Sequence, residues 1–465
     1  MELTRQSATQ LLSDLSARRL SAVELMSATL ERIEQVNPGV NAIVALQDAE
    51  SLMDQARARD HGPAQGPLHG LPLAIKDLVN VAGIASTKGS PLYEGYIPKV
   101  DDLLAARLRA AGAILIGKTN VPELGLGSHT FNPVYGTTCN PYDTARSCGG
   151  SSGGAAVALA TGMVALADGT DMMGSLRNPA AWNNVYGFRP SWGRVPANPD
   201  GDGFLHRVST PGPMARDPSD LAFLLDVMSV PSKKLPYGVD CPPVSPLTPA
   251  KLKDLRIGWL GDWGGAYAME DGVLDLCESA LAVLSDLGCT VDSMPPPFSS
   301  EAMWDSWTTL RSWSEASDNA NLTDHLDRMK PTAQWEIERG LKLTAVQVHH
   351  ASVARSQWFR CAAELFDSFD ALVLPSAQVW PFATEETYPK MINGTAMDTY
   401  HRWMEVMVPV SLAGLPCLAA PVGFGSQGLP MGFQLFGPNG SDAKLLAVGA
   451  AYHEATRHPQ SHPAF

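Results

Sequence analysis

The amino-acid sequence predicts an α/β protein with one large sheet and peripheral helices. Two observations predict this class. The chain has 465 residues, of which 45% are hydrophobic and 18% charged, so it can bury a sizeable core. Apolar runs of strand length also alternate with segments of helical periodicity. Because no internal repeat divides the chain, residues 1–465 are expected to form a single domain.

Helical periodicity dominates the start of the chain. Ser21 and Glu24 have the spacing of a capping box, and apolar residues then recur at helical spacing up to Pro38. Residues 1–60 are therefore expected to form an N-terminal helical layer. The following apolar and periodic segments predict a strand at 71–76, a helix at 101–111 and a strand at 113–116.

The same alternation returns in the second half of the chain. It predicts a strand at 255–260, a helix at 273–287, and strands at 289–294 and 370–374. Residues 230–250 lie between the two halves and are rich in proline. Prolines fix φ and lack the backbone donor, so this segment is expected to be a surface excursion rather than a core element.

Composition excludes several classes of partner. Acidic residues outnumber basic ones by 48 to 34, and no Lys/Arg cluster offsets this, so neither nucleic acid nor a membrane surface is expected as a partner. The longest apolar run, residues 155–167, is shorter than the ~20 residues of a bilayer span. The N-terminus is polar and has no signal-peptide pattern, so a cytoplasmic location is expected.

Neither disulfides nor a metal site is expected. The seven cysteines are scattered without a CxxC pair, which indicates reduced thiols. His453 and His458 are five residues apart, so on a helix their rings would point ~140° apart and could not share one ion.

Two segments match the residue pattern of a known motif, but their neighbouring residues do not predict the secondary structure that the motif requires. Residues 112–119 satisfy the phosphate-loop pattern, yet their apolar centre reads as a strand instead of the polar, glycine-rich turn that a phosphate needs. Ser151 and Ser152 each satisfy the GxSxG pattern of a nucleophile elbow. That elbow requires a strand directly before the serine, whereas the preceding residues here are polar and turn-like.

Three other segments contain candidate catalytic residues. The glycine- and serine-rich residues 148–154 lead into a helix of small apolar residues at 155–162, so two serines are expected at a buried helix N-terminus. A flexible linker is the alternative, but linkers are followed by polar sequence or a new domain. Downstream, a turn presents Ser175. Upstream, Lys76 ends the apolar run that is predicted to be a strand.

Taken in order, these segments resemble the amidase signature family. The resemblance is carried by residues 66–77, 117–125, 148–154, 168–179, 414–416 and 429–438. It implies an α/β/α sandwich, with a large mixed twisted sheet covered by helices on both faces. It also implies a catalytic signature core at 66–200 and a variable, substrate-facing region at 295–400.

The resemblance further implies a catalytic triad. Ser175 would be the nucleophile, Ser151 the bridging serine on a cis peptide bond, and Lys76 the base. A serine hydroxyl needs a neighbouring base, and a lysine can serve only when it is neutral. Burial must therefore lower the pKa of Lys76 from about 10.4 toward 7 or 8, and the apolar strand that precedes it suits this need. No metal or other cofactor is required.

Further roles follow from the same resemblance. The backbone N–H groups of Met172, Met173, Gly174 and Ser175 would form the oxyanion hole, and Ser152, Asp171 and Arg177 would support the loops. Family members commonly have glycine at the position of Met173. A side chain there either narrows the acyl pocket or forbids a positive φ.

The expected activity is hydrolysis of carboxylic amide C–N bonds through an acyl-enzyme, on aryl or bulky apolar small-molecule amides. Alternatives are a carbamate (urethane) or ester hydrolase with the same triad, a glutamine-amidohydrolysing subunit of a tRNA amidotransferase, and a non-catalytic binding protein. A homodimer is left open. Five tryptophans could form an aromatic substrate wall, although ordinary helix packing is favoured: Trp304, Trp307, Trp313, Trp335 and Trp358.

Overall fold

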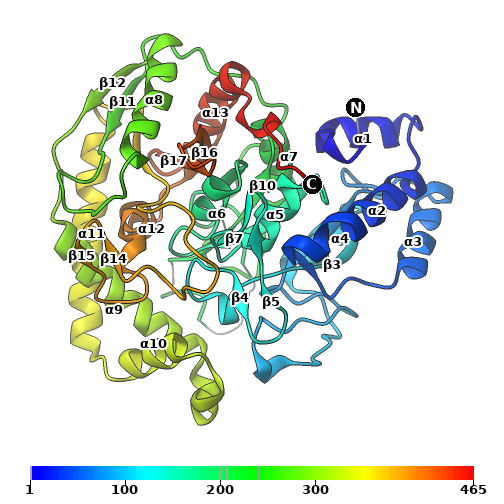
Figure 1. Ribbon diagram of the computed structural model, residues 1–465, viewed down its shortest axis with the longest axis horizontal. Coiled ribbons are helices and arrows are strands. Elements are labelled where there is room, and N and C mark those ends of the chain that lie inside the picture. The colour runs from blue at the N-terminus through cyan, green and yellow to red at the C-terminus, as the bar shows by residue number, and fades with distance from the viewer. Residues whose placement is uncertain (1–2, 198–201, 206–207, 239) are drawn as a thin grey trace.

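The computed structural model describes residues 3–197, 202–205, 208–238 and 240–465. The chain is an α/β protein with a large mixed sheet and many helices, as predicted (Figure 1). Residues 198–200 of the predicted core and residue 239 of the predicted excursion lie outside the described residues. None of the described helices combines the length and apolar character needed to cross a bilayer.

The α-helices are α1 (Ala8–Ser16), α2 (Ala22–Val40), α3 (Ala49–His61), α4 (Leu103–Ala110), α5 (Gly153–Ala160), α6 (Arg177–Trp182), α7 (Pro218–Met228), α8 (Val273–Asp286), α9 (Ser300–Asp318), α10 (Pro331–Leu341), α11 (Ala345–Leu365), α12 (Val408–Ala413) and α13 (Asp442–Thr456). Short 3-10 helices span Leu3–Arg5, Pro91–Tyr93, Glu123–Gly125, Ala320–Arg328, Arg402–Met407 and His458–Gln460.

The strands are β1 (Ile43–Val44), β2 (Pro72–Lys76), β3 (Ile114–Thr119), β4 (Phe131–Asn132), β5 (Gly136–Thr137), β6 (Cys139–Asn140), β7 (Asp143–Ser147), β8 (Leu166–Asp171), β9 (Tyr186–Arg189), β10 (Thr210–Ala215), β11 (Arg256–Trp259), β12 (Thr290–Ser293), β13 (Ala371–Pro375), β14 (Met391–Ile392), β15 (Thr395–Ala396), β16 (Cys417–Phe424) and β17 (Pro430–Phe436).

The large sheet has the strand order β12-β11-β13-β17-β16-β9-β10-β8 within the described chain. Strand β11 runs parallel to β12 and β13, and the other neighbours are antiparallel. Helices pack against both faces of this sheet. Consecutive residues of a strand point to opposite faces, so neighbouring residues of one strand contact different helices. Leu418 of β16 reaches Gly449 of α13, whereas Ala419 belongs to the same apolar cluster as Ala180 of α6.

A smaller sheet adjoins the large one. Strands β1, β3 and β2 form a separate three-stranded sheet in that order, so the early strands are not part of the large sheet. The backbone N–H of Lys76 at the end of β2 donates to Asp168 Oδ1 of β8 at 3.0 Å, which ties the two sheets together. Helix α5 contacts β2, β3, β8 and β10, and all eight of its residues are buried.

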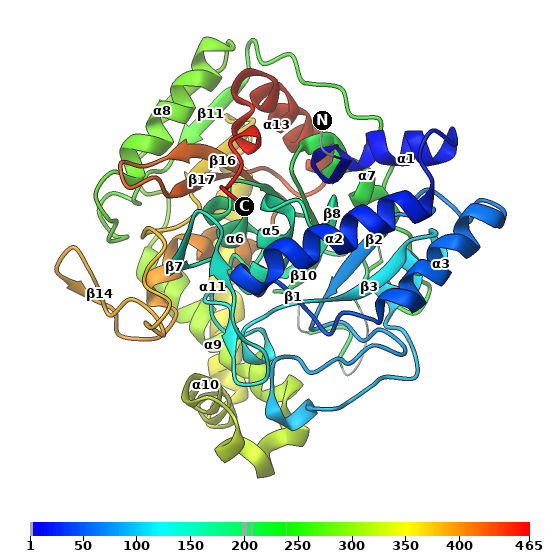
Figure 2. The same ribbon diagram turned by 45° about the vertical axis from the view of Figure 1, so that its right-hand side comes forward.

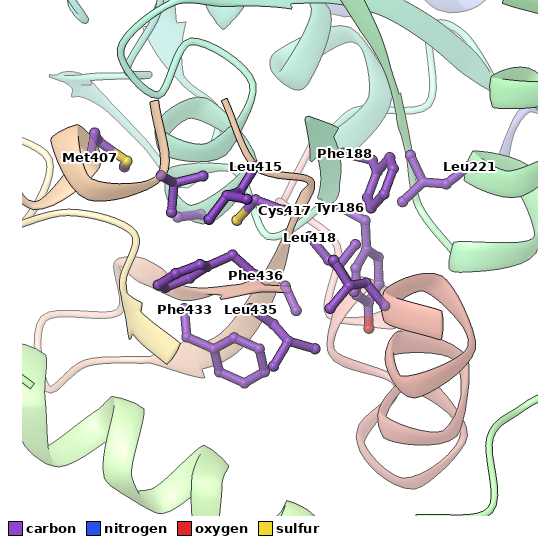
Figure 3. Close-up of a cluster of buried hydrophobic side chains, with 14 of the residues drawn as sticks. Tyr186, Phe188, Leu221, Met407, Leu415, Cys417, Leu418, Phe433, Leu435 and Phe436 are labelled. Carbon is purple, nitrogen blue, oxygen red and sulfur yellow. The ribbon is translucent and has the colours of Figure 1, made fainter. Parts of the chain in front are cut away.

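The core beneath the site is built from β16 and β17. The side chains of Leu418, Phe433 and Leu435 lie on one face of these strands and Phe436 lies on the other, and all four are buried (Figure 3). Burying each such side chain stabilises the fold by about 1.5 to 3 kcal/mol. Strand β17 also carries Gln434, whose side chain accepts from Arg177 next to the site.

Local signals in the sequence set several boundaries. The Ser21 and Glu24 capping box begins α2, although the helix continues through Pro38 to Val40. The predicted strand at 113–116 extends to Thr119, so Lys118 lies inside β3 and not in a phosphate-binding loop. The described part of 230–250 contains neither helix nor strand.

Helices α9, α10 and α11 lie on the side of the molecule away from α1, α2 and α3 (Figures 1 and 2).

Candidate active site

Lys76 is the last residue of β2 and is fully buried. Its Nζ lies 2.9 Å from Ser151 Oγ, 2.9 Å from Ser152 Oγ and 2.8 Å from Thr170 Oγ1. A neutral amine can satisfy three such hydroxyls with two N–H donors and one lone pair. The Thr170 carbonyl oxygen lies 3.4 Å from the same Nζ and can only accept. The contacts fit either form of the lysine, and its pKa decides which form is present.

Burial lowers the pKa of Lys76 from 10.5 to about 7, while the negative charges of Asp168 and Asp171 oppose this shift. Removing an ammonium from water penalises its charged form, and the nearby carboxylates recover only part of that penalty. Near neutral pH the side chain can therefore exist in the neutral form that a base requires.

The loop before α5 carries the two serines. The Gly150–Ser151 peptide bond is cis, as the resemblance implies for the bridging serine. Ser152 is the N-cap of α5, and its N–H donates to the carbonyl oxygen of Ser175 at 3.1 Å. Glycine is required at the start of α5, because a Cβ on Gly154 would lie 2.3 Å from the backbone N of Asn120.

Ser175 lies in the turn between β8 and α6 and is 8% exposed. Ser151 and Ser175 line the same cavity of about 90 Å³. The structure therefore brings together three residues that are far apart in the sequence: Lys76 is hydrogen-bonded to Ser151, and Ser151 shares a cavity with Ser175.

The turn before Ser175 presents backbone donors. In the described chain, the N–H groups of Met172, Met173 and Ser175 have no hydrogen-bond acceptor. Gly174 departs from the expectation, because its N–H donates to Asp171 Oδ1 at 3.0 Å and is not free for an oxyanion. Its φ of +86° and the Met407 Cγ that a Cβ would meet at 2.6 Å still require glycine there.

Asp171 anchors this turn. Its carboxylate accepts from Arg177 at 2.9 and 3.0 Å and from Arg189 at 3.0 Å, and all three side chains are buried. Burial raises the pKa of Asp171, but the two guanidinium groups outweigh this and hold it well below its usual value. Arg177 also donates to Gln434 Oε1 at 2.5 Å and Ser411 Oγ at 2.6 Å.

A serine–histidine pair also lies near the loop. Ser147 Oγ is 2.8 Å from His129 Nδ1, and the N–H of Gly149 donates to Ser147 Oγ at 3.1 Å. Both side chains are buried and neither lines the cavity with Ser175. This pair therefore supports the loop, and it does not replace the lysine as a base for Ser175.

Met173 lines the catalytic cavity, and its φ is not positive. Of the two effects expected from a side chain at this position, narrowing of the pocket therefore applies. We expect Met173→Gly to retain hydrolysis and to shift the preference toward larger acyl groups, because the N–H donor is kept while space is gained. Comparing kcat/KM over acyl chains of increasing length tests this, and an unchanged profile would contradict it.

Sequence reasoning missed three residues at the site. Thr170 contacts Lys76, and Arg311 and Glu315 line the catalytic cavity. A signal for the last two was present: they are four residues apart on a helix, among small and apolar residues that face inward.

The five tryptophans do not form a substrate wall. None of them lines the catalytic cavity or the larger cavity beside it. Trp304, Trp307 and Trp358 are buried in the main apolar core, in agreement with the favoured interpretation of helix packing.

A cavity of about 810 Å³ adjoins the catalytic one, and Leu78, Met172 and Ser209 line both. Its wall includes the aromatic side chains of Tyr93, Trp192 and Tyr237. Within the described ranges, no three His, Cys, Asp or Glu side chains converge as metal ligands.

The chain matches known proteins over nearly its whole length. The Amidase family model matches residues 24–446. The chain is 32% identical over 461 residues to an acylamidase of Rhodococcus erythropolis, covering 97% of this chain and 95% of that one. It is 33% identical over 469 residues to the A subunit of the glutamyl-tRNA(Gln) amidotransferase of Thermus thermophilus, covering 94% of each.

A solved structure shows the same fold. A bacterial aryl acylamidase of the amidase signature family superposes with a TM-score of 0.91 at 26% identity, covering 98% of this chain and 99% of the other. The similarity therefore extends over the whole architecture and is not confined to the signature segments.

Proposed function

This chain belongs to the amidase family and is a hydrolase of carbon–nitrogen bonds other than peptide bonds, and we propose that it acts through Lys76, Ser151 and Ser175. The observation that carries this proposal is the contact of 2.9 Å between Lys76 Nζ and Ser151 Oγ, beside a cavity that also holds Ser175.

The proposed cycle has two stages. Neutral Lys76 takes the proton of Ser151 as Ser151 takes that of Ser175, and the Ser175 oxygen attacks the amide carbonyl carbon. The free N–H groups of the turn stabilise the oxyanion, where loss of one donor typically costs about 3 kcal/mol of barrier. Ser151 then protonates the departing amine and regains a proton from Lys76. Water hydrolyses the acyl-enzyme and restores Ser175.

We propose aryl or bulky apolar amides as substrates. The large cavity beside the site supports this, because its aromatic side chains offer flat apolar surface for a ring. The similarity to the aryl acylamidase supports an aryl amide, and the similarity to the acylamidase supports amide hydrolysis more generally. A carbamate or ester could use the same residues, because only the leaving half differs. Rates on matched amide, ester and carbamate compounds of p-nitroaniline and p-nitrophenol separate these activities.

A glutamine-hydrolysing role is the second candidate, favoured by the 33% identity to a component of an amidotransferase. It predicts ammonia release from glutamine and a requirement for partner proteins. Turnover of aryl amides by the isolated chain would count against it.

Covalent labelling tests the nucleophile. We expect a fluorophosphonate probe to label the wild-type chain, Ser175→Ala to abolish labelling and Lys76→Ala to slow it. Ser209→Ala is a matched control, because Ser209 also lines the cavity but has no role in the proposed cycle. Mass spectrometry of the labelled peptide identifies the site. A wild-type chain that is not labelled would favour the non-catalytic binding protein.

A further inference from the structure

A charged pair on α9 lies in the catalytic cavity and takes no part in the triad. Arg311 and Glu315 are one helical turn apart and both line the cavity that contains Ser151 and Ser175. Their side chains are only 5% and 11% exposed. Charged side chains are rarely buried so deeply unless they have a partner or a function.

Arg311 is anchored on one side only. Its Nε donates to Glu336 Oε2 at 3.4 Å, and its Nη2 donates to the Tyr400 hydroxyl at 3.0 Å. Its Nη1 contacts Met172 Sδ at 2.9 Å, and a thioether sulfur is a weak acceptor. The guanidinium is thus held in place while the Nη1 end, beside the cavity, keeps unused capacity to donate.

Glu315 also has unused capacity to form hydrogen bonds. One of its oxygens lies 3.8 Å from Arg311 Nη2, which is too far for a hydrogen bond, and the other accepts from Asn319 Nδ2 at 3.5 Å. The charge of Arg311 is already balanced by Glu336. Burial opposes ionisation of Glu336, but Arg311 and His401 hold the pKa of this carboxyl below its usual value.

We propose that Arg311 and Glu315 recognise a second carboxamide group on the substrate. Its carbonyl oxygen accepts from Nη1–H of Arg311, and its N–H donates to the carboxyl group of Glu315. This inference rests on the proposed amidase function and narrows its substrate class: the preferred compounds contain a neutral amide in addition to the one that is cleaved.

The charges around the pair favour a neutral group. A substrate carboxylate would meet Glu336 and the ionised fraction of Glu315, whose pKa burial raises to about 7. A substrate ammonium would meet Arg311, with Lys330 nearby. An apolar group would displace water from both side chains and leave their polar atoms unpaired. A carboxamide carries one acceptor and one donor without net charge, so it matches the guanidinium and the carboxyl together.

Matched substrates test the proposal. On the acyl side, 3-carbamoylpropanoyl 4-nitroanilide is compared with the 4-methylpentanoyl, 3-carboxypropanoyl and 4-aminobutanoyl 4-nitroanilides. On the amine side, 4-acetamidobenzamide is compared with 4-isopropylacetanilide. We expect the carboxamide to exceed its apolar counterpart in kcat/KM by about tenfold or more in at least one series, and to exceed both charged acyl compounds.

Variants separate recognition from a structural role. We expect Arg311→Met and Glu315→Leu to remove the carboxamide preference, mainly through KM, and Glu315→Gln to retain part of it because its amide can still accept. Arg311 also contacts Met172 in the oxyanion turn, so a merely structural role would lower kcat on both compounds of a series and leave their ratio unchanged.

Failure of the inference can be told from failure of the proposed function. If the wild-type chain hydrolyses the apolar anilides without preferring a carboxamide in either series, or if both variants keep the preference, the recognition pair is overturned and the amidase function stands. If the wild-type chain cleaves none of these compounds and no fluorophosphonate labels Ser175, the proposed function itself fails.

Discussion

Lys76→Met is expected to lower kcat/KM on an anilide substrate by about 10³-fold, because general-base catalysis contributes 10²- to 10⁴-fold and no other group of the described chain contacts Ser151 as a base. Methionine fills a similar volume and cannot accept the proton. Stopped assays on 4-nitroacetanilide measure the effect. A loss of less than about tenfold would contradict the assignment of Lys76 as the base.

The pH dependence of kcat/KM also tests the assignment of Lys76 as the base. Since Lys76 must be neutral to act, kcat/KM of the wild-type chain is expected to rise with pH and to level off above about 7, the value to which burial lowers the pKa of this lysine. Lys76→Met should lose this ionisation. Lys444→Met is a control, because it removes a lysine that lines neither cavity and whose partner Asp370 lies 2.6 Å away. It should keep the midpoint near 7.

The same lysine should make the protein less stable at neutral pH. Its pKa is about 7 in the folded chain, against an ordinary value of 10.5, so the unfolded chain binds one more proton between these values and the free energy of unfolding rises with pH across this window. The difference between the two pKa values corresponds to roughly 5 kcal/mol of unfolding free energy, at about 1.4 kcal/mol per pKa unit. Urea unfolding at pH 7 and pH 10 should show a smaller rise for Lys76→Met than for the wild-type chain.

Local signals account for what the sequence predicted of the site. Lys76 ends an apolar run, and Ser151 lies in a glycine-rich loop before an apolar helix, so each residue could be placed on its element from its own neighbours. Their convergence followed from the resemblance of the signature segments. The local pattern could not show that the small sheet is separate from the large one, because strand pairing depends on contacts between segments that are distant in the sequence.

Contacts made by distant elements were not predictable in this way. The spacing of Arg311 and Glu315 marks one face of a helix, but it does not show that α9 packs so that this face lines the cavity with Ser175. The Gly174 N–H was expected in the oxyanion hole, but the Asp171 carboxylate competes for it. A sequence motif identifies the donor groups of a turn, whereas only the folded geometry shows which of them are already satisfied.

Asp171→Ala is expected to destabilise the fold by about 3 to 5 kcal/mol, because it leaves Arg177 and Arg189 buried without their shared carboxylate. It also removes the acceptor for the N–H groups of Gly174 and Leu176, so the oxyanion turn should loosen and kcat should fall. Urea unfolding measures the first effect and initial rates the second.

The control for this change is a surface pair of the same kind. Asp143 lies 3.6 Å from Arg146 with both side chains more than a third exposed, and Asp143→Ala should cost less than about 1 kcal/mol.

Because the pKa of Asp171 is lower in the folded chain than its ordinary value of 3.8, the contribution of Asp171 to stability is complete above about pH 4 and is lost as the pH falls further. Asp171→Asn, which keeps the shape, serves if Asp171→Ala does not fold. A loss no larger than that of Asp143→Ala would show that the buried carboxylate does not hold the turn.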